Sequence, residues 1–232
     1  MAQLDLLQQQ FQILNTDVSH LNALKMNDKL PMMESQLRNL VNNFQHAQIM
    51  GSTVYTVWGR KSCPVVNGTE IVYTGITGGK SYSVIGSGVD MLCLPHDPES
   101  APADFPTSVF DHRAGKIWGS EYQFTYKNIA VDDTVPCAVC KVRAATSTLM
   151  IPAKRSCPLN WTLQYKGVIA TGNDKEYASD FVCIDENPEY FEGTRMNNFD
   201  GRTLYPISAQ CGSLPCPPYK QDQYIACVVC SL

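Results

Sequence analysis

Ten cysteines occupy one part of the chain, and they constrain its fold more than any other feature. All of them fall between Cys63 and Cys230, whereas the first 62 of the 232 residues contain none. An even number of cysteines confined to one region is typical of a disulfide framework, which persists in an oxidising compartment. The sequence therefore predicts a disulfide-bonded region after residue 62.

Two N-glycosylation sequons also favour an extracellular protein. They are Asn67-Gly68-Thr69 and Asn160-Trp161-Thr162. Each follows a cysteine by three or four residues, at matching places of the internal repeat described below. We therefore predict a secreted protein that carries glycans on Asn67 and Asn160.

Charge and hydropathy exclude two classes of partner. The net charge is -4 and the pI is near 5.5, and no run of Lys and Arg could follow a phosphate backbone, so no nucleic-acid binding is expected. No stretch approaches the ~20 apolar residues of a transmembrane helix, so no membrane insertion is expected. Residues 1–10 lack the basic start and apolar centre of a signal peptide, so we expect that any signal has already been removed.

Apolar residues recur over residues 1–50 at alternating spacings of three and four, the pattern of a coiled-coil seam. The first run is Leu4, Leu7, Phe11, Leu14, Val18 and Leu21. A second run, in a shifted register, is Met26, Leu30, Met33, Leu37, Leu40 and Phe44. Pro31 lies near the change of register and lacks a backbone donor, which predicts a kink or break there.

The residues that flank this seam are mostly uncharged amides, so the apolar stripe needs burial against another copy of itself. We predict that residues 1–50 form an α-helical coiled-coil stalk that makes the protein a homo-oligomer. A single amphipathic helix packed on its own domain is the alternative. Because few charges flank the seam, the number of helices in the coiled coil is open between two and three, and we favour a trimer. The assembly is either a closed oligomer or an open filament.

The remainder is a tandem repeat of two units, residues 51–146 and 147–232. Four blocks recur in the same order with their cysteines in register: 60–64 with 154–158, 72–75 with 164–167, 92–94 with 182–184, and 135–140 with 225–230. Four ordered matches make a strong repeat signal, although each alone is weak.

Short runs rich in Val, Tyr, Thr and Ile predict strands within both units. These runs are residues 54–57, 70–74, 162–165 and 224–229, separated by Gly and Pro. No long helical period follows residue 51. The predicted fold is mainly β: a tandem duplicated disulfide-rich β domain preceded by an N-terminal α-helical coiled-coil stalk.

Four cysteines recur in each unit: Cys63, Cys93, Cys137 and Cys140, then Cys157, Cys183, Cys227 and Cys230. The extra pair in the second unit, Cys211 and Cys216, most simply bonds to itself. Neighbours in a Cys-x-x-Cys pair diverge along a strand and bond more easily to separate partners, which leaves a nested or a crossed pairing open. Redox and zinc roles are disfavoured, because no helix follows the pairs and they lie 90 residues apart, against roughly 15–20 in a zinc ribbon.

Four motifs together resemble a known family. They are Trp-Gly-Arg-x-x-Cys-Pro at 58–64, Leu-Cys-Leu-Pro-His-Asp-Pro at 92–98, Val-Pro-Cys-Ala-Val-Cys at 135–140, and Cys-Gly-Ser-Leu-Pro-Cys-Pro-Pro-Tyr at 211–219. Over about residues 52–232 the chain resembles the cysteine-rich module of marine-invertebrate short-chain collagen C4-like proteins, which are related to spongin-type collagens. More distantly, it is similar to the C-terminal non-collagenous domain of type IV collagen, which has two β-rich halves.

The resemblance implies nested disulfides with one short local bridge. Carried over by position, these are Cys63–Cys140, Cys93–Cys137, Cys157–Cys230, Cys183–Cys227 and Cys211–Cys216. The first unit lacks the short bridge, and the chain has no Gly-x-y repeat, so it cannot form a collagen triple helix. The coiled coil would then supply the association that collagen gains from its triple helix.

Candidate catalytic and metal-binding groups are weak. A Ser-His-Asp site would have to combine Ser87 with His96 or His112 and with Asp90 or Asp97. Ser87 lacks the full nucleophile-elbow motif, and Asp-Pro is foremost a turn former. The acidic pairs at 132–133 and 185–186 lack the spacing of a Ca²⁺ loop. We predict no catalytic residue, metal or cofactor, and no enzyme.

Aromatic residues are the better indication of binding. Tyr73 and Tyr165, which match between the units, are predicted to be core residues, whereas Trp118, Tyr190 and Phe191 are candidates for surface contacts. The predicted function is that of a secreted, self-assembling structural protein of an extracellular matrix or fibre. The alternative is a soluble multivalent lectin-like recognition protein, and the partners are then glycans or other matrix proteins.

Overall fold

The computed structural model describes residues 2–23, 30–105, 114–195 and 201–232. The chain divides into two compact units, Met1–Gly51 and Ser52–Leu232. The first unit holds both helices and the second all ten strands. Within these ranges, no helix has the combination of length and apolar character that a membrane span requires.

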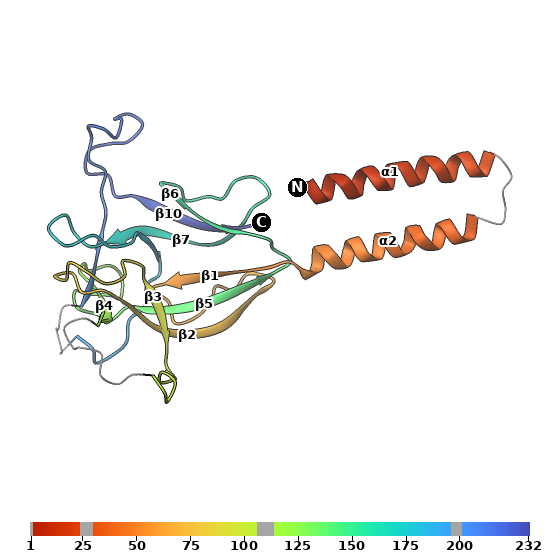
Figure 1. The fold of residues 1–232 in the computed structure, drawn as a ribbon. Coiled ribbons are helices and arrows are strands. Elements are labelled where there is room, and N and C mark those ends of the chain that lie inside the picture. Colours follow the sequence, from red (N-terminus) through yellow and green to blue (C-terminus); the bar gives the residue numbers. More distant parts are fainter. Residues whose placement is uncertain (1, 24–29, 106–113, 196–200) are drawn as a thin grey trace. The chain divides into compact units, whose positions relative to one another are not determined.

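The N-terminal unit consists of α1 (Ala2–Ala23) and α2 (Leu30–Met50), which contact each other (Figure 1). The sequence predicted a kink or break near Pro31. In the structure α1 ends at Ala23 and α2 begins at Leu30, so Pro31 lies in the first turn of the second helix. A proline is tolerated in the first turn of a helix, where its missing N–H would have no intrahelical partner anyway. Pro31 therefore starts the second helix and does not interrupt it.

The coiled-coil seam is only partly covered in one chain. Phe11 is 38% exposed. The other seam residues whose side chains the structure describes are half-buried: Leu7, Leu14, Val18, Met33, Leu37 and Leu40. The side chains outside the description are those of Leu4, Leu21, Met26, Leu30 and Phe44. Association through this seam stays a prediction.

The second unit is one mixed ten-stranded sheet. In the first repeat its strands are β1 (Ser52–Trp58), β2 (Thr69–Gly79), β3 (Leu92–Pro95), β4 (Trp118–Tyr122) and β5 (Pro136–Arg143). In the second repeat they are β6 (Thr148–Pro152), β7 (Thr162–Thr171), β8 (Val182–Asp185), β9 (Arg202–Pro206) and β10 (Ala226–Ser231). The mainly β class predicted from the sequence is confirmed.

The two repeats have the same strand order. The first runs β1-β5-β2-β3 and the second β6-β10-β7-β8, with β4 also on β2 and β9 also on β7. Backbone hydrogen bonds recur as well: Thr77 N–H donates to Val135 O at 3.0 Å, and Ile169 N–H to Ile225 O at 2.9 Å. The sequence repeat is therefore a structural repeat.

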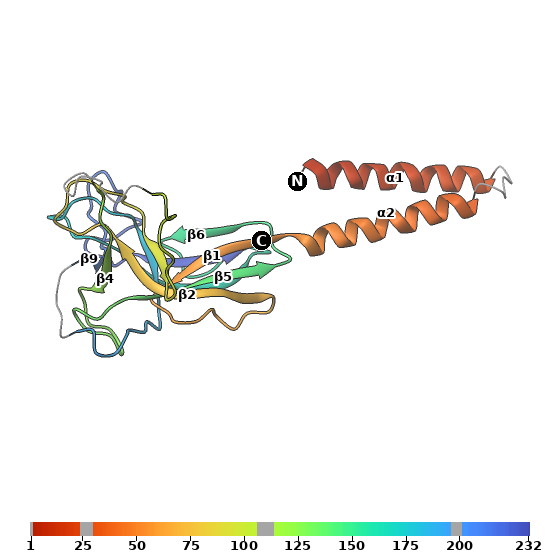
Figure 2. The same cartoon turned by 60° about the horizontal axis from the view of Figure 1, so that its bottom comes forward.

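The repeats are joined into a single compact unit and do not form separate bodies. β8 of the second repeat pairs in parallel with β1 of the first, with Ile184 opposite Trp58. β4 pairs in parallel with β9, and Figure 2 shows these two strands together at one end of the unit. Because β9 also pairs with β7, the hydrogen-bonded path from β7 through β8, β1, β5, β2 and β4 returns to β7.

Matched glycines bring strands close in both repeats. A Cβ atom at Gly75 would overlap the carbonyl of Leu94 in β3, and one at Gly167 would overlap the carbonyl of Ile184 in β8. These positions require glycine because another backbone takes up the space of a side chain. The glycine in each Tyr-x-Gly match thus fixes the strand that carries the second cysteine of its repeat.

Two hydrophobic clusters fill the unit. The larger one draws on both repeats, and its buried members include Tyr55, Val57, Val142, Tyr165, Ile169 and Val229. The smaller one also crosses between the repeats, with Tyr122, Ile129, Val135, Val182, Ile184 and Leu204. Because neither cluster belongs to one repeat alone, each repeat needs the other to complete its core.

Candidate functional site

The five disulfides form the frame of the molecule. The bonded pairs are Cys63–Cys140, Cys93–Cys137, Cys157–Cys230, Cys183–Cys227 and Cys211–Cys216, and no described cysteine is free. This is the nested arrangement that the family resemblance implied, and it excludes the crossed one. The two Cys-x-x-Cys pairs bond to separate partners, as expected for cysteines on opposite faces of a strand.

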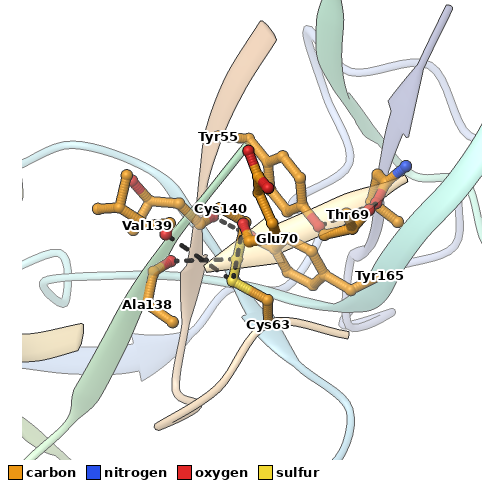
Figure 3. Close-up of a disulfide and its surroundings, with 10 residues drawn as sticks. Tyr55, Cys63, Thr69, Glu70, Ala138, Val139, Cys140 and Tyr165 are labelled. Carbon is orange, nitrogen blue, oxygen red and sulfur yellow. Dashed lines mark hydrogen bonds between the residues drawn. A yellow bond between two sulfur atoms is a disulfide. The ribbon is translucent and has the colours of Figure 1, made fainter. Parts of the chain in front are cut away.

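Figure 3 shows the Cys63–Cys140 disulfide beside the contact between the repeats. Tyr55 Oη donates to Gln164 Oε1 at 2.9 Å, and Thr69 Oγ1 donates to the same oxygen at 2.9 Å. The rings of Tyr55 and Tyr165 stack with their centroids 6.1 Å apart. We call the surface along which residues 54–61 meet residues 162–191 the repeat junction.

Tyr165 lies at the centre of the repeat junction. Its hydroxyl is 3.0 Å from Thr56 O in the first repeat and 3.1 Å from Cys183 O in its own repeat. Burial raises the pKa of Tyr165 far above its ordinary value, and it raises the pKa of Tyr55 as well. Both phenols are therefore neutral at physiological pH, and their hydroxyl groups serve as hydrogen-bond donors.

Charged groups close one edge of the repeat junction. Arg60 lies 3.6 Å from an Asp185 oxygen and 3.5 Å from a Glu189 oxygen. The backbone N–H of Lys61 donates to Glu189 Oε2 at 2.6 Å. Burial raises the pKa of Asp185, and the hydrogen bond from the Asn187 N–H and the charge of Arg60 oppose this shift. The junction thus combines a stacked aromatic centre with a polar rim.

A second cross-repeat ion pair accounts for one of the acidic pairs weighed as a Ca²⁺ site. The buried Asp133 accepts two hydrogen bonds from Arg195, at 2.9 and 2.7 Å, and another from the Ala130 N–H at 2.8 Å. A carboxylate held in this way by a guanidinium is already compensated. Among the residues that the structure describes, no group of three or more side chains could hold a metal ion.

The buried guanidinium of Arg202 is a feature that the sequence did not predict. Its side chain is 1% exposed, donates to Val89 O at 3.3 Å and to Asp180 O at 3.2 Å, and has a pKa lowered by burial. The two carbonyls come from different repeats, so Arg202 fastens loops of both. A single Arg at the start of a strand, directly after Gly201, gives no signal in the sequence that it is buried.

The predicted contact residues Trp118, Tyr190 and Phe191 are all half-buried. The rings of Phe191 and His96 are nearly perpendicular with their centroids 5.6 Å apart, and Lys61 Nζ lies 5.1 Å from the Phe191 centroid. Tyr190 packs on the smaller cluster. Tyr190 and Phe191 therefore already have partners across the repeats, and their role in external contacts stays a prediction.

The prediction that Tyr73 and Tyr165 are both core residues is half right. Tyr165 is 5% exposed, but Tyr73 is 38% exposed. Both hydroxyls make the same bond within their own repeat, Tyr73 to Cys93 O at 3.0 Å and Tyr165 to Cys183 O. The difference is that β1 covers Tyr165, whereas none of the strands in the described residues covers Tyr73.

The residues weighed as a Ser-His-Asp site are engaged elsewhere. Ser87 Oγ donates to Lys116 O at 3.2 Å, and His96 rests against Phe191. His112 lies outside the described residues. Within the described ranges, Ser87 and His96 share no hydrogen bond. Both sequon asparagines, Asn67 and Asn160, are exposed, as a glycan would require.

Comparisons with known proteins found no match to the chain, either among protein-family models or among curated proteins.

Proposed function

We propose that the chain is a secreted structural protein that assembles with copies of itself into an extracellular matrix or fibre. The observation that carries this proposal is the coiled-coil seam, whose described apolar side chains stay half-buried or exposed in one chain. An apolar helical stripe of this kind gains its remaining burial from another copy. The five disulfides support an oxidising, extracellular setting.

The disulfide-bonded unit suits a mechanical role. Four of its bridges close chain segments of 44 to 77 residues, and bridges of this length each stabilise a fold by about 4 kcal/mol in the chain-entropy model. Copies held together by residues 1–50 would present several such resistant units on one particle. The family resemblance to collagen-like matrix proteins agrees with this proposal without testing it.

Deleting residues 1–50 tests the proposal. The β unit has its own core and disulfides, so we expect the shortened protein to keep its β circular-dichroism spectrum. Its mass by light scattering should fall relative to that of the full chain, because the seam is gone. An unchanged multi-copy mass would contradict the role of residues 1–50.

A lectin-like function is the second candidate, favoured by a groove at the repeat junction. The groove has a volume of about 230 Å³ and is lined in part by Tyr55, Trp58, Tyr165, Asp180 and Phe181. Aromatic faces beside a carboxylate are typical of sugar sites. A glycan array with the full-length protein separates the two candidates, because a purely structural protein should show no selective binding.

A further inference from the structure

The two repeats are joined head to tail, which leaves one strand at each end of the series, β3 and β6, paired on one edge only within the described residues. The strand order β6-β10-β7-β8 of the second repeat continues directly into β1-β5-β2-β3 of the first, through the contact of β8 with β1. The corresponding ends that remain are β3 at one side and β6 at the other. No strand in the described chain pairs with the second edge of either one.

Burial shows that β3 lacks the cover that its counterpart has. The strand β8 is buried at all four positions, whereas β3 is exposed at both ends and only half-buried between them. Beyond the strands, Pro188 is buried but its counterpart Pro98 is exposed. Tyr73, at 38% exposed, differs from Tyr165 in the same way.

The face that would supply this cover is exposed as well. Counted from the matched cysteines, Leu149 in β6 takes the place of Tyr55 in β1, and the two are 48% and 7% exposed. Ile151 is half-buried, whereas its counterpart Val57 is 1% exposed. The first residue of β6 is already engaged within the chain, because Thr148 Oγ1 donates to Val54 O of β1 at 3.3 Å. Further along β6, however, the Leu149 side chain stays exposed where its counterpart Tyr55 is buried at the repeat junction.

Charge complementarity is preserved at the open ends. Within the chain, Arg60 faces Glu189 at the repeat junction; their counterparts, three residues before and six after the matched cysteines, are Lys154 and Glu99. Both are exposed, and neither makes an ion pair within the described residues. Lys154 and Glu99 therefore carry opposite charges on two surfaces of the chain that the repeat junction does not bring together.

We propose that β6 and residues 153–155 of one copy dock on β3 and Tyr73 of a second copy, as β1 and residues 59–61 dock on β8 and Tyr165 within each chain. This inference rests on the proposed self-assembly and names its second surface. In the docked pair, Met150 O takes the place of Thr56 O as the additional acceptor near the Tyr73 hydroxyl. Lys154 then faces Glu99 of the other copy.

The proposed contact between copies depends more on side chains, and less on backbone pairing, than the repeat junction does. Trp58 and Ile184 are strand partners, but the counterpart of Trp58 is Pro152, which lacks a backbone donor. The contact between copies is consequently weaker than the repeat junction and depends on association through residues 1–50. Because it joins two different surfaces, it closes into a ring or continues as a filament.

Engineered cysteines test the contact in the full-length chain. Leu94 and Pro152 correspond to the paired residues Ile184 and Trp58, so a chain carrying L94C and P152C should form disulfides between copies under mild oxidation. Non-reducing gels should show most of the protein as covalent multimers, one discrete size for a ring or a ladder for a filament. The matched controls, L94C alone and P152C alone, should not extend beyond a covalent dimer.

Charge reversal gives an independent measurement on exposed residues. E99K should lower the particle mass or raise the dissociation constant between copies at least several-fold, and E99K/K154E should restore it. If the wild-type particle contains several copies but the L94C/P152C chain forms no multimers, the docking proposal is wrong while the proposed function stands. A wild-type chain that is monomeric at all concentrations overturns both.

Discussion

The two repeats share one architecture, yet their equivalent parts have different surroundings. Each repeat has the same strand order, the same pair of nested disulfides and the same tyrosine bonded to the carbonyl of its second cysteine. In the second repeat β1 covers that region, and in the first repeat no strand of the described chain covers it. The strands and disulfides of each repeat therefore follow from its own sequence, whereas the burial of a given surface depends on whether another repeat packs against it.

The largest expected difference between the repeats concerns the inner disulfides, which span the same 44 residues. Removing either bridge with paired alanines, C93A/C137A or C183A/C227A, should cost about 4 kcal/mol of loop entropy. The second variant should lose more, because Cys183 is buried and Cys93 only half-buried, so a cavity adds to the loss. Urea unfolding of the two variants measures the difference, and equal midpoints would contradict it.

The matched glycines should show a smaller contrast. Gly167→Ala should destabilise the protein by about 3 kcal/mol, because β8 is held between β7 and β1 and cannot move away from a new Cβ atom. Gly75→Ala meets the same overlap, but β3 is free at one edge and can shift, so its cost should be nearer 1 kcal/mol. Thermal unfolding of both variants orders them, and a greater loss for Gly75→Ala would contradict the contrast.

Removing one hydroxyl group should separate the tyrosines further. Tyr165→Phe leaves buried carbonyls without their donor and should cost about 1–2 kcal/mol. Tyr73→Phe should cost under about 0.5 kcal/mol in the β unit, because Tyr73 is 38% exposed and water can replace its hydrogen bond to Cys93 O. Denaturant titration of the protein without residues 1–50 provides the comparison free of association. Equal losses would mean that cover by β1 is not what distinguishes the two tyrosines.

The charged counterparts should give the smallest effect. Arg60→Ala removes two partly exposed ion pairs at the repeat junction and should cost about 1 kcal/mol at low salt, falling as salt screens the charges. Lys154→Ala should leave the stability of the single chain unchanged, since Lys154 has no ion pair among the described residues. Unfolding at two salt concentrations tests both statements, and a salt-independent loss for Arg60→Ala would rule out the ion pairs as its cause.

The parts of the fold that depend on local spacing could be predicted from the sequence. Cysteine register identified the repeats, and β-rich runs located strands, although β10 begins at Ala226 and not at residue 224. Pro31 pointed to the neighbourhood in which one helix gives way to the next, and it lies in the first turn of α2, where proline is accommodated. These outcomes follow from rules that operate within a few residues of the position concerned.

Other features depend on contacts between the repeats and left no such signal. Nothing in the sequence shows that Arg202 is buried against carbonyls of two loops, or that Asp133 and Arg195 pair across 62 residues. Matched positions were also misleading for Tyr73, because similarity between repeats predicts shared local structure and not shared cover. Each repeat meets a different neighbour, so equivalent residues can differ in burial.

The mass of the native particle tests the central claim of self-assembly most directly. Light scattering with electron microscopy on the full-length chain, in non-reducing physiological buffer, gives both mass and shape. We predict a particle of several copies, a discrete ring-like oligomer or an open filament. The mass of a single chain at every concentration, 25.7 kDa for the polypeptide plus any glycans, would contradict the account.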